Sequence, residues 1–298
     1  MFIVSAIAGY ALLGLVALLD KFILSKKVSH PLAYTFYIAI PFLFLLLFLP
    51  FGIKFPGDIY GWGGVISGGL FYFLGLWLMF AGIQKSEISH VGPLVGASVT
   101  LSTVLLGWIF LGETLPFNGL VGVGLLVFGS LLISHEKSKK HNGFHFGMLE
   151  GVLSGIFFAI SYTTSKYCYD ALGFYSGLVL TRGMLGLLGL CLLSLPFVRR
   201  EIFLKNKVKR LPKQNRVVVF ANLIFSAVAV FLIQYAVSVG SVSVVSAFEG
   251  LKYAILIILV ALLSKFFPKI LKEDYAKGEM RQEILAVCLI GLGLVLLI

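Results

Sequence analysis

The chain has 298 residues, of which 59% are hydrophobic and only 12% are charged. Soluble domains carry about 25% charged residues, so this composition excludes a water-soluble globular protein and predicts an integral membrane protein. The formal net charge of +11 does not indicate binding to nucleic acid. Membrane proteins collect Lys and Arg in cytoplasmic loops, and no basic stripe with interleaved aromatic residues lies outside such loops.

Apolar runs long enough to cross a bilayer as helices recur along the chain between short polar or charged breaks. The first run has no positive region before it, so it predicts a transmembrane helix rather than a cleaved signal peptide. The runs lack the alternating polarity of a membrane β-barrel. We therefore predict an all-α integral membrane fold with ten transmembrane helices, at about 2–24, 32–50, 59–84, 92–111, 117–134, 147–169, 174–197, 216–238, 243–264 and 283–298.

Short segments of the first half recur in the second half in the same order. The segment LLDKFILSKK around Lys21 parallels TTSKYCYDAL around Lys166, and LLFLPF ending at Phe51 parallels LLSLPF ending at Phe197. Two further matches follow these in register. The pattern indicates an internal duplication.

A unit of five helices crosses the membrane an odd number of times, so a tandem copy enters with the opposite orientation. We therefore predict two inverted five-helix repeats, residues 1–140 and 141–298. Inverted repeats are typical of secondary transporters, whose substrate site lies near the membrane midplane between the repeats.

The segment from Ala81 to Ile133 carries a specific pattern. A polar turn is followed by Pro93, then by LGE at Leu111–Glu113, and then by a Gly-rich run. In this respect the chain resembles the EamA-type branch of the drug/metabolite transporter superfamily, which consists of ten-helix, twice-repeated carriers. The second half departs from the pattern, since Phe248 stands opposite Pro93 and no LGE closes the ninth helix. The resemblance implies a central cavity lined mainly by helices one, three, four, six, eight and nine.

Two ionisable residues, Glu249 and Lys252, stand in the apolar stretch SAFEGLKYAILIILVALL. Their spacing puts them on one helix face, which Ser246 and Tyr253 extend. An ionisable side chain inside a membrane helix costs about 2.5–3.5 kcal/mol and therefore indicates a functional site. We predict that Lys252 holds an anionic group of the substrate and that Glu249 holds a cationic group or a proton. A purely structural ion pair and snorkelling to the interface are the alternatives.

Other polar residues in apolar segments are further candidates for substrate contact. Arg182 would bind substrate or a backbone carbonyl, or would snorkel to the interface. Ser161 and Ser165 share one helical stripe, and Asn222 and Tyr72 lie in the eighth and third helices. Hydroxyls in membrane helices often bond their own backbone and buried aromatic rings often only pack, so both readings stay open.

Lys21 and Lys166 occupy matching positions near the ends of helices one and six. Each is predicted to be either an interfacial anchor or a gate. Glu113 is expected to be a helix-end interfacial residue rather than a proton carrier. Glycines such as Gly122 and Gly124 predict close helix contacts.

The cysteines have no metal-binding or disulfide spacing, and His135, His141 and His145 lie in a basic loop without a fourth ligand. We therefore predict no metal or other cofactor. Lys and Arg concentrate in the loops after the odd-numbered helices, which puts those loops in the cytoplasm and both termini outside.

These features predict a secondary transporter of the plasma membrane that moves a small polar organic metabolite, such as an amino acid, by alternating access. Its expected partners are this small-molecule substrate, the lipid bilayer and a coupling proton or ion. An exchanger of anionic metabolites, phosphorylated or nucleotide-sugar-like, is the alternative. A membrane-embedded enzyme acting on lipid-linked groups is a further alternative, although no nucleophile–base constellation occurs at midplane depth.

Overall fold

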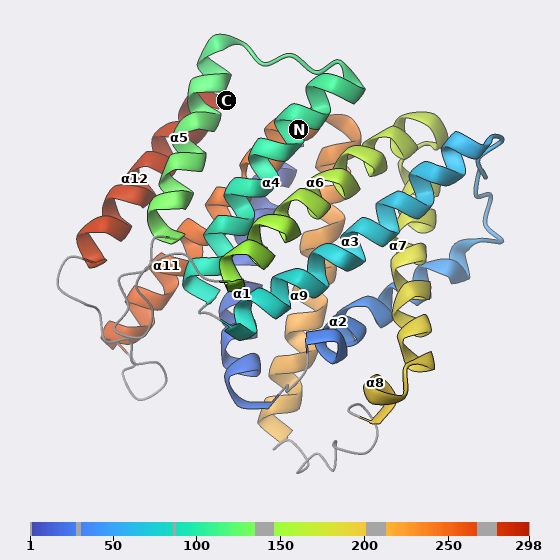
Figure 1. The fold of residues 1–298 in the computed structure, drawn as a ribbon, viewed down its shortest axis with the longest axis horizontal. Helices are drawn as coiled ribbons and strands as arrows, with labels where there is room; N and C mark the ends of the chain where they lie inside the picture. Colours follow the sequence, from blue (N-terminus) through green and yellow to red (C-terminus); the bar gives the residue numbers. More distant parts are fainter. Residues whose placement is uncertain are drawn as a thin grey trace.

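The computed structural model describes residues 2–27, 31–85, 88–134, 146–200, 213–266 and 279–297, and all regular elements among them are helices (Figure 1). The three loop histidines lie outside these residues. The backbone of Lys21 belongs to the first helix, but its side chain is outside the described part of the chain.

The elements follow in chain order as α1 (Phe2–Lys27), α2 (Pro31–Ala39), the 3₁₀ helix η1 (Ile40–Phe48), α3 (Ile59–Lys85), α4 (Ile88–Leu111), α5 (Phe117–Ser134), α6 (Phe146–Leu172), α7 (Phe174–Cys191), the 3₁₀ helix η2 (Leu192–Ser194), α8 (Pro196–Arg200), α9 (Lys213–Val239), α10 (Val242–Ala247), α11 (Glu249–Phe266) and α12 (Glu279–Leu297).

The all-helical membrane architecture is confirmed, but the number of ten spans is not. Within the described residues, eight helices are long and apolar enough to cross a membrane. The helix α6 is long but more polar, because serine and threonine residues run along it. In α12 the apolar part, Ile284–Leu297, is shorter than a full span.

The second expected helix is built from two kinds of helix. It is α-helical as far as Ala39 and then continues as the nine-residue 3₁₀ helix η1. Pro41 stands at the start of η1, where its ring and missing N–H disfavour a continued α-helix. The neighbouring α7 approaches closely at Gly186, where an added Cβ would lie 2.5 Å from the backbone nitrogen of Leu43.

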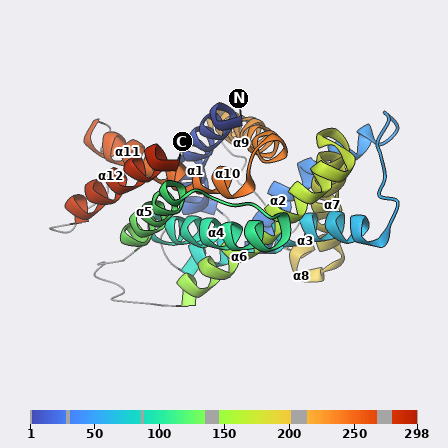
Figure 2. The same cartoon turned by 90° about the horizontal axis from the view of Figure 1, so that it is seen from above.

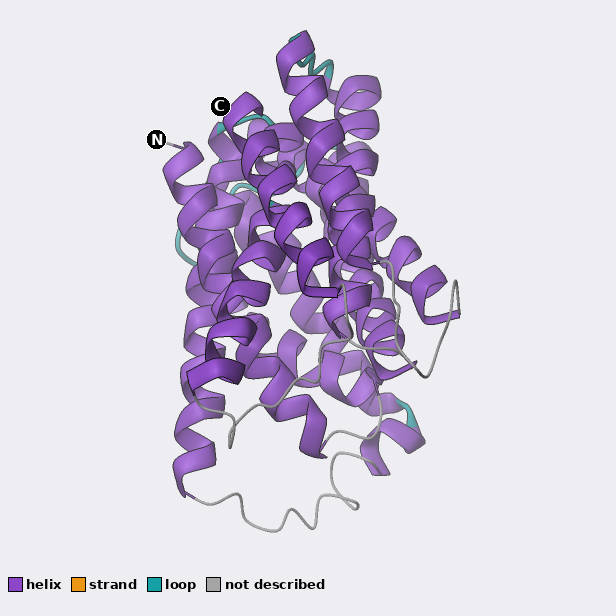
Figure 3. Ribbon diagram, turned by 90° about the vertical axis from the view of Figure 1, so that its left-hand side faces the viewer, coloured by secondary structure: helices purple, strands orange, loops and turns teal. Residues whose placement is uncertain are grey.

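The helices of the two halves interlock in one bundle. The helix α6 packs along both α3 and α4, α1 packs along α9 and α11, and α5 packs along α12. Viewed from above, α5, α11 and α12 gather at one side and α2, α7 and α8 at the other, with α1, α4, α6, α9 and α10 between them (Figure 2). The start of α1 and the end of α12 lie towards the same end of the bundle (Figure 3).

Serine hydroxyls hold the closest of these contacts. Ser154 and Ser161 of α6 donate to the backbone carbonyls of Gly75 and Gly68 in α3, at 2.7 and 2.6 Å. Glycines at these places let the two backbones approach, and the hydroxyls gain partners that lipid cannot supply. The α3–α6 contact is therefore both close and hydrogen-bonded.

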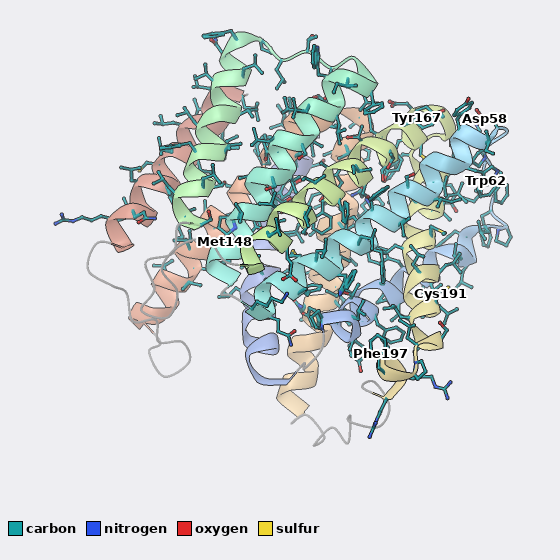
Figure 4. The ribbon with its side chains drawn as sticks, viewed as in Figure 1. Asp58, Trp62, Met148, Tyr167, Cys191 and Phe197 are labelled. Atoms are coloured by element: carbon teal, nitrogen blue, oxygen red, sulfur yellow. The ribbon has the colours of Figure 1, made fainter. Side chains whose placement is uncertain are left out.

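The outside of the bundle is apolar. Large exposed hydrophobic side chains include Phe44, Leu105, Trp108, Phe128 and Phe231. Figure 4 shows Asp58, Trp62 and Tyr167 at one end of the bundle and Phe197 towards the other. Such a surface is unfavourable in water and suits lipid, so the chain is a membrane-embedded, multi-pass protein.

Candidate functional site

The ninth predicted helix is tightened at one residue in the structure, where Phe248 N–H donates to the Val245 carbonyl and Leu251 N–H donates to the Phe248 carbonyl. It was expected to be continuous over 243–264, but α10 ends at Ala247 and α11 begins at Glu249. Neither Gly nor Pro stands at the tightened turn, which falls at the buried Phe248. The Thr100 hydroxyl of α4 donates to the Ser246 carbonyl over 3.2 Å, which supplies a partner to backbone near this turn.

Glu249 and Lys252 meet at the start of α11. Lys252 donates a hydrogen bond from its ammonium group to the Glu249 carboxylate, and the Glu249 side chain is only 5% exposed. The Lys252 ammonium also lies 4.4 Å from the centre of the Tyr253 ring. The spacing therefore predicted the contact between the two charges, and their contact with substrate stays a prediction.

Two glycines of α4 make room for this part of α11. An added Cβ at Gly92 would lie 2.5 Å from the Tyr253 ring, and one at Gly96 would lie 2.8 Å from it. The Glu249 side chain also lies against Gly96. The Glu249 and Tyr253 side chains of α11 thus pack directly on the backbone of α4.

Arg182 of α7 is fully buried. Its guanidinium carbon lies 4.1 Å from the centre of the Tyr72 ring of α3, a cation–π contact. Its Nε, Nη1 and Nη2 atoms make no hydrogen bond to any described residue. Of the three alternatives for Arg182, binding to a backbone carbonyl and snorkelling therefore do not fit this structure.

Tyrosines connect Arg182 to the ion pair. Tyr72 and Tyr162 both interact electrostatically with Arg182 and with Glu249, and their ring centres are 6.4 Å apart. Tyr10 of α1, which is fully buried, interacts with Glu249 as well. We call this group the central polar cluster; its members are Tyr10, Tyr72, Tyr162, Arg182, Glu249 and Lys252.

The remaining candidates are placed in different surroundings. Ser161 is committed to the α3 backbone, and the Ser246 hydroxyl donates to the Ser243 carbonyl over 3.1 Å. The Ser165 hydroxyl is buried without a hydrogen bond among the described residues. Asn222 is buried in α9.

Sequence reasoning did not single out a second buried polar pair, Tyr169 and Gln234. The Tyr169 hydroxyl donates to the Gln234 side-chain oxygen over 2.8 Å and links α6 to α9. The sequence signal that could have indicated this pair is the single amide side chain, Gln234, in the apolar run FLIQYA.

Lys166 and Glu113 both hold the turn between α9 and α10. Lys166 donates to the Ser238 carbonyl near the end of α9 and pairs with Asp170, both at 3.0 Å. Glu113 accepts hydrogen bonds from the backbone amides of Val242 and Ser243. A cation thus lies at a helix C-terminus and an anion at a helix N-terminus, as helix dipoles favour.

Glu113 follows α4, as its place in LGE predicted, but it is more than an interfacial residue. It also accepts a hydrogen bond from the Ser241 hydroxyl over 2.7 Å. Its carboxylate is therefore occupied as a cap of α10. Among the described residues, His, Cys, Asp and Glu form no group of three that could hold a metal ion.

Comparison with known proteins gives a similar solved structure and a similar protein family. A solved crystal structure matches with a TM-score of 0.66 over 98% of this chain and 95% of that chain; at 16% identity this likeness concerns the fold alone. No curated protein matches. The model of the EamA-like transporter family matches residues 1–135. The first half of the chain is therefore similar to this family.

Proposed function

We propose that the protein is a secondary transporter of the plasma membrane that moves a small polar organic metabolite by alternating access. The observation that carries this proposal is the central polar cluster. It brings two cations and one carboxylate together inside an apolar bundle. Ionisable groups inside a membrane are costly and mark substrate or ion pathways.

The burial of Glu249 inside the bundle supports a binding role for this region. Glu249 lies in the first turn of α11, where a carboxylate is favoured by the helix dipole. As the carboxylate of the cluster, Glu249 is the group that we propose for a coupling proton.

The pattern of helix contacts supports the proposal that residues 1–140 and 141–298 are repeats of one unit, and the odd number of predicted helices in each makes their inversion part of the same proposal. The eighth and ninth predicted helices are α9 and α10–α11 in the structure. If the halves are repeats, α1 corresponds to α6, α3 to α9, α4 to α11 and α5 to α12. The contact of α3 with α6 then corresponds to that of α9 with α1, and the contact of α4 with α6 corresponds to that of α11 with α1. The α5–α12 contact maps onto itself. These contacts are all observed.

In the proposed cycle, the turn between α9 and α10 is one of the moving parts. Its bonds to Lys166 and Glu113 close the end of the bundle at which they lie. Lys166 would act as a gate residue that releases the Ser238 carbonyl when this end opens. The cluster is buried in the present conformation, which supports a closed state of this pathway.

The test is counterflow in proteoliposomes. Purified full-length protein is reconstituted, the vesicles are loaded with one unlabelled solute, and uptake of the same labelled solute is followed. The panel contains amino acids, organic acids, sugars, nucleotides and phosphorylated metabolites. Saturable counterflow of one class supports the carrier. Non-saturating flux would indicate a channel, and chemical conversion of the solute would indicate an enzyme; either result would refute the proposal.

A further inference from the structure

The charge of Arg182 has no hydrogen-bonded or ion-pair partner among the residues that the structure describes. The side chain is 0% exposed, and all three guanidinium nitrogens lack a hydrogen bond among the described residues. Arginine does not lose its proton in proteins, and an unpaired buried charge is strongly unfavourable. The cation–π contact with Tyr72 covers one face of the guanidinium but leaves its five N–H donors unused.

The described carboxylates are all engaged elsewhere. Glu249 binds Lys252, Asp170 binds Lys166, Glu150 binds Lys85, Glu113 binds the start of α10, and Asp58 accepts from the Gly61 amide. The central polar cluster therefore contains Arg182 and Lys252 against Glu249 alone. While Glu249 is ionised, as in its ion pair with Lys252, two positive charges and one negative charge leave these described residues with a formal charge of +1.

A second unused donor lies beside α7. The buried Ser165 hydroxyl of α6 makes no hydrogen bond of ordinary geometry to a described residue, although the Tyr169 phenol lies close enough to interact with it and with Arg182. An added Cβ on Gly68 of α3 would lie 3.2 Å from this hydroxyl and 3.1 Å from the side chain of Thr181, the residue next to Arg182. The side chains of Ser165 and Thr181 thus both lie against Gly68. The Ser165 hydroxyl is therefore close to the turn of α7 that carries Arg182.

We infer that Arg182 binds the carboxylate of the transported solute, with the Ser165 hydroxyl as an additional donor, and that the substrate is a small organic monocarboxylate with a net charge of −1. A guanidinium binds a carboxylate through two parallel N–H···O bonds. One such anion neutralises the charge of +1 on the cluster. A zwitterion would leave that charge unchanged, and a dianionic phosphate ester would reverse it. This inference rests on the proposed transport function and narrows its substrate class.

The first experiment measures binding without transport. Thermal unfolding of the purified full-length protein in detergent is followed with three-carbon probes: L-lactate, L-alanine, sn-glycerol 3-phosphate and glycerol. We expect L-lactate to raise the unfolding temperature more than the other three. No response to lactate, or a larger response to alanine or to glycerol 3-phosphate, would overturn the inference.

Arg182→Met tests the residue itself, and Arg200→Met is its matched control, because Arg200 is exposed on α8. We expect the control to keep the lactate response and Arg182→Met to lose it. Without solute, Arg182→Met should unfold at the same temperature as the wild type or higher, because an uncompensated buried charge has been removed. A less stable or misfolded Arg182→Met protein would show that Arg182 is structural and would refute the proposal.

Arg182→Lys keeps the positive charge but removes the planar guanidinium, whose parallel N–H groups can bind both oxygens of a carboxylate. We expect its apparent affinity for lactate to fall by roughly tenfold or more. Unchanged affinity would mean that the guanidinium does not bind the carboxylate.

Counterflow of labelled L-lactate separates this inference from the proposed function. Lactate binding that depends on Arg182 but produces no counterflow would keep the anion site and refute the transporter. Equal lactate counterflow by wild type and Arg182→Met would keep the transporter and refute the anion site.

Discussion

The carboxylate of Glu113 accepts a hydrogen bond from the backbone amide of Val242 over 2.7 Å. This bond connects the segment after α4 to the first turn of α10. A second carboxylate oxygen accepts from Ser243 and from the Ser241 hydroxyl, so one side chain satisfies several donors at a helix start.

Glu113→Gln should therefore weaken the attachment of α10. The amide keeps the shape of the side chain but loses the negative charge that the helix start favours. We expect the free energy of unfolding, measured by SDS titration, to fall by about 1–2 kcal/mol. Asp170→Asn is the control; its carboxylate is 54% exposed, so it should change stability by less than about 0.5 kcal/mol. Equal stability of both variants would contradict the capping role.

Lys166→Met should loosen the same turn from its other side. The variant loses the bond to the Ser238 carbonyl, so we expect faster amide hydrogen exchange in residues 238–243. Lys54→Met, at an exposed lysine, should leave this exchange unchanged. If exchange in the turn is the same in both variants, Lys166 does not hold it.

Glu249→Gln and Lys252→Met should each abolish counterflow, because either change leaves one member of a buried pair without its partner. Each single variant should also lose about 3 kcal/mol of stability. The double variant should recover part of this stability but not transport, since the charges that we propose to contact substrate are gone. Normal counterflow by both single variants would remove the pair from the proposed site.

Gly122 and Gly124 of α5 offer a matched test of helix packing. An added Cβ on Gly122 would lie 2.7 Å from the Gly293 carbonyl oxygen of α12, whereas one on Gly124 would meet nothing within 4 Å. We expect Gly122→Leu to cost about 1–3 kcal/mol by separating α5 from α12. Gly124→Leu should be nearly neutral. A similar loss of stability in both would show that the contact with α12 is not the cause.

The distribution of Lys and Arg predicts that both termini lie outside the cytoplasm. A phosphatase reporter fused after Ile298 should therefore be active. An inactive phosphatase together with a fluorescent cytoplasmic-type reporter at the same position would reverse this orientation.

The apolar runs predicted most helix ends well, because the length of a membrane helix is set by bilayer thickness. They did not predict the tightened turn at Phe248. A proline disfavours a continuous helix, yet α4 runs through Pro93, the residue that stands opposite Phe248, without interruption. The bond from Thr100 to the Ser246 carbonyl lies near the turn at Phe248, and it joins residues far apart in sequence.

Only part of the candidate site was predicted, because some of its contacts also join residues far apart in sequence. Helical spacing was enough to bring Glu249 and Lys252 together, since both lie on one helix. The relation of Arg182 to Tyr72 joins two helices, and the role of Tyr10 depends on a third. The lack of a partner for Arg182 among the described residues depends on where their carboxylates lie, and no local sequence pattern gives those positions.

The 3₁₀ segment η1 changes how far its span reaches. Pro31–Phe48 contains 18 residues, which as a continuous α-helix would measure about 27 Å. Because nine of them form a 3₁₀ helix with a rise of about 2.0 Å per residue, the span measures about 31 Å, close to the hydrocarbon thickness of roughly 30 Å. This short span thus matches its bilayer with little mismatch, and rewinding η1 into α-helix would oblige the surrounding lipid to thin.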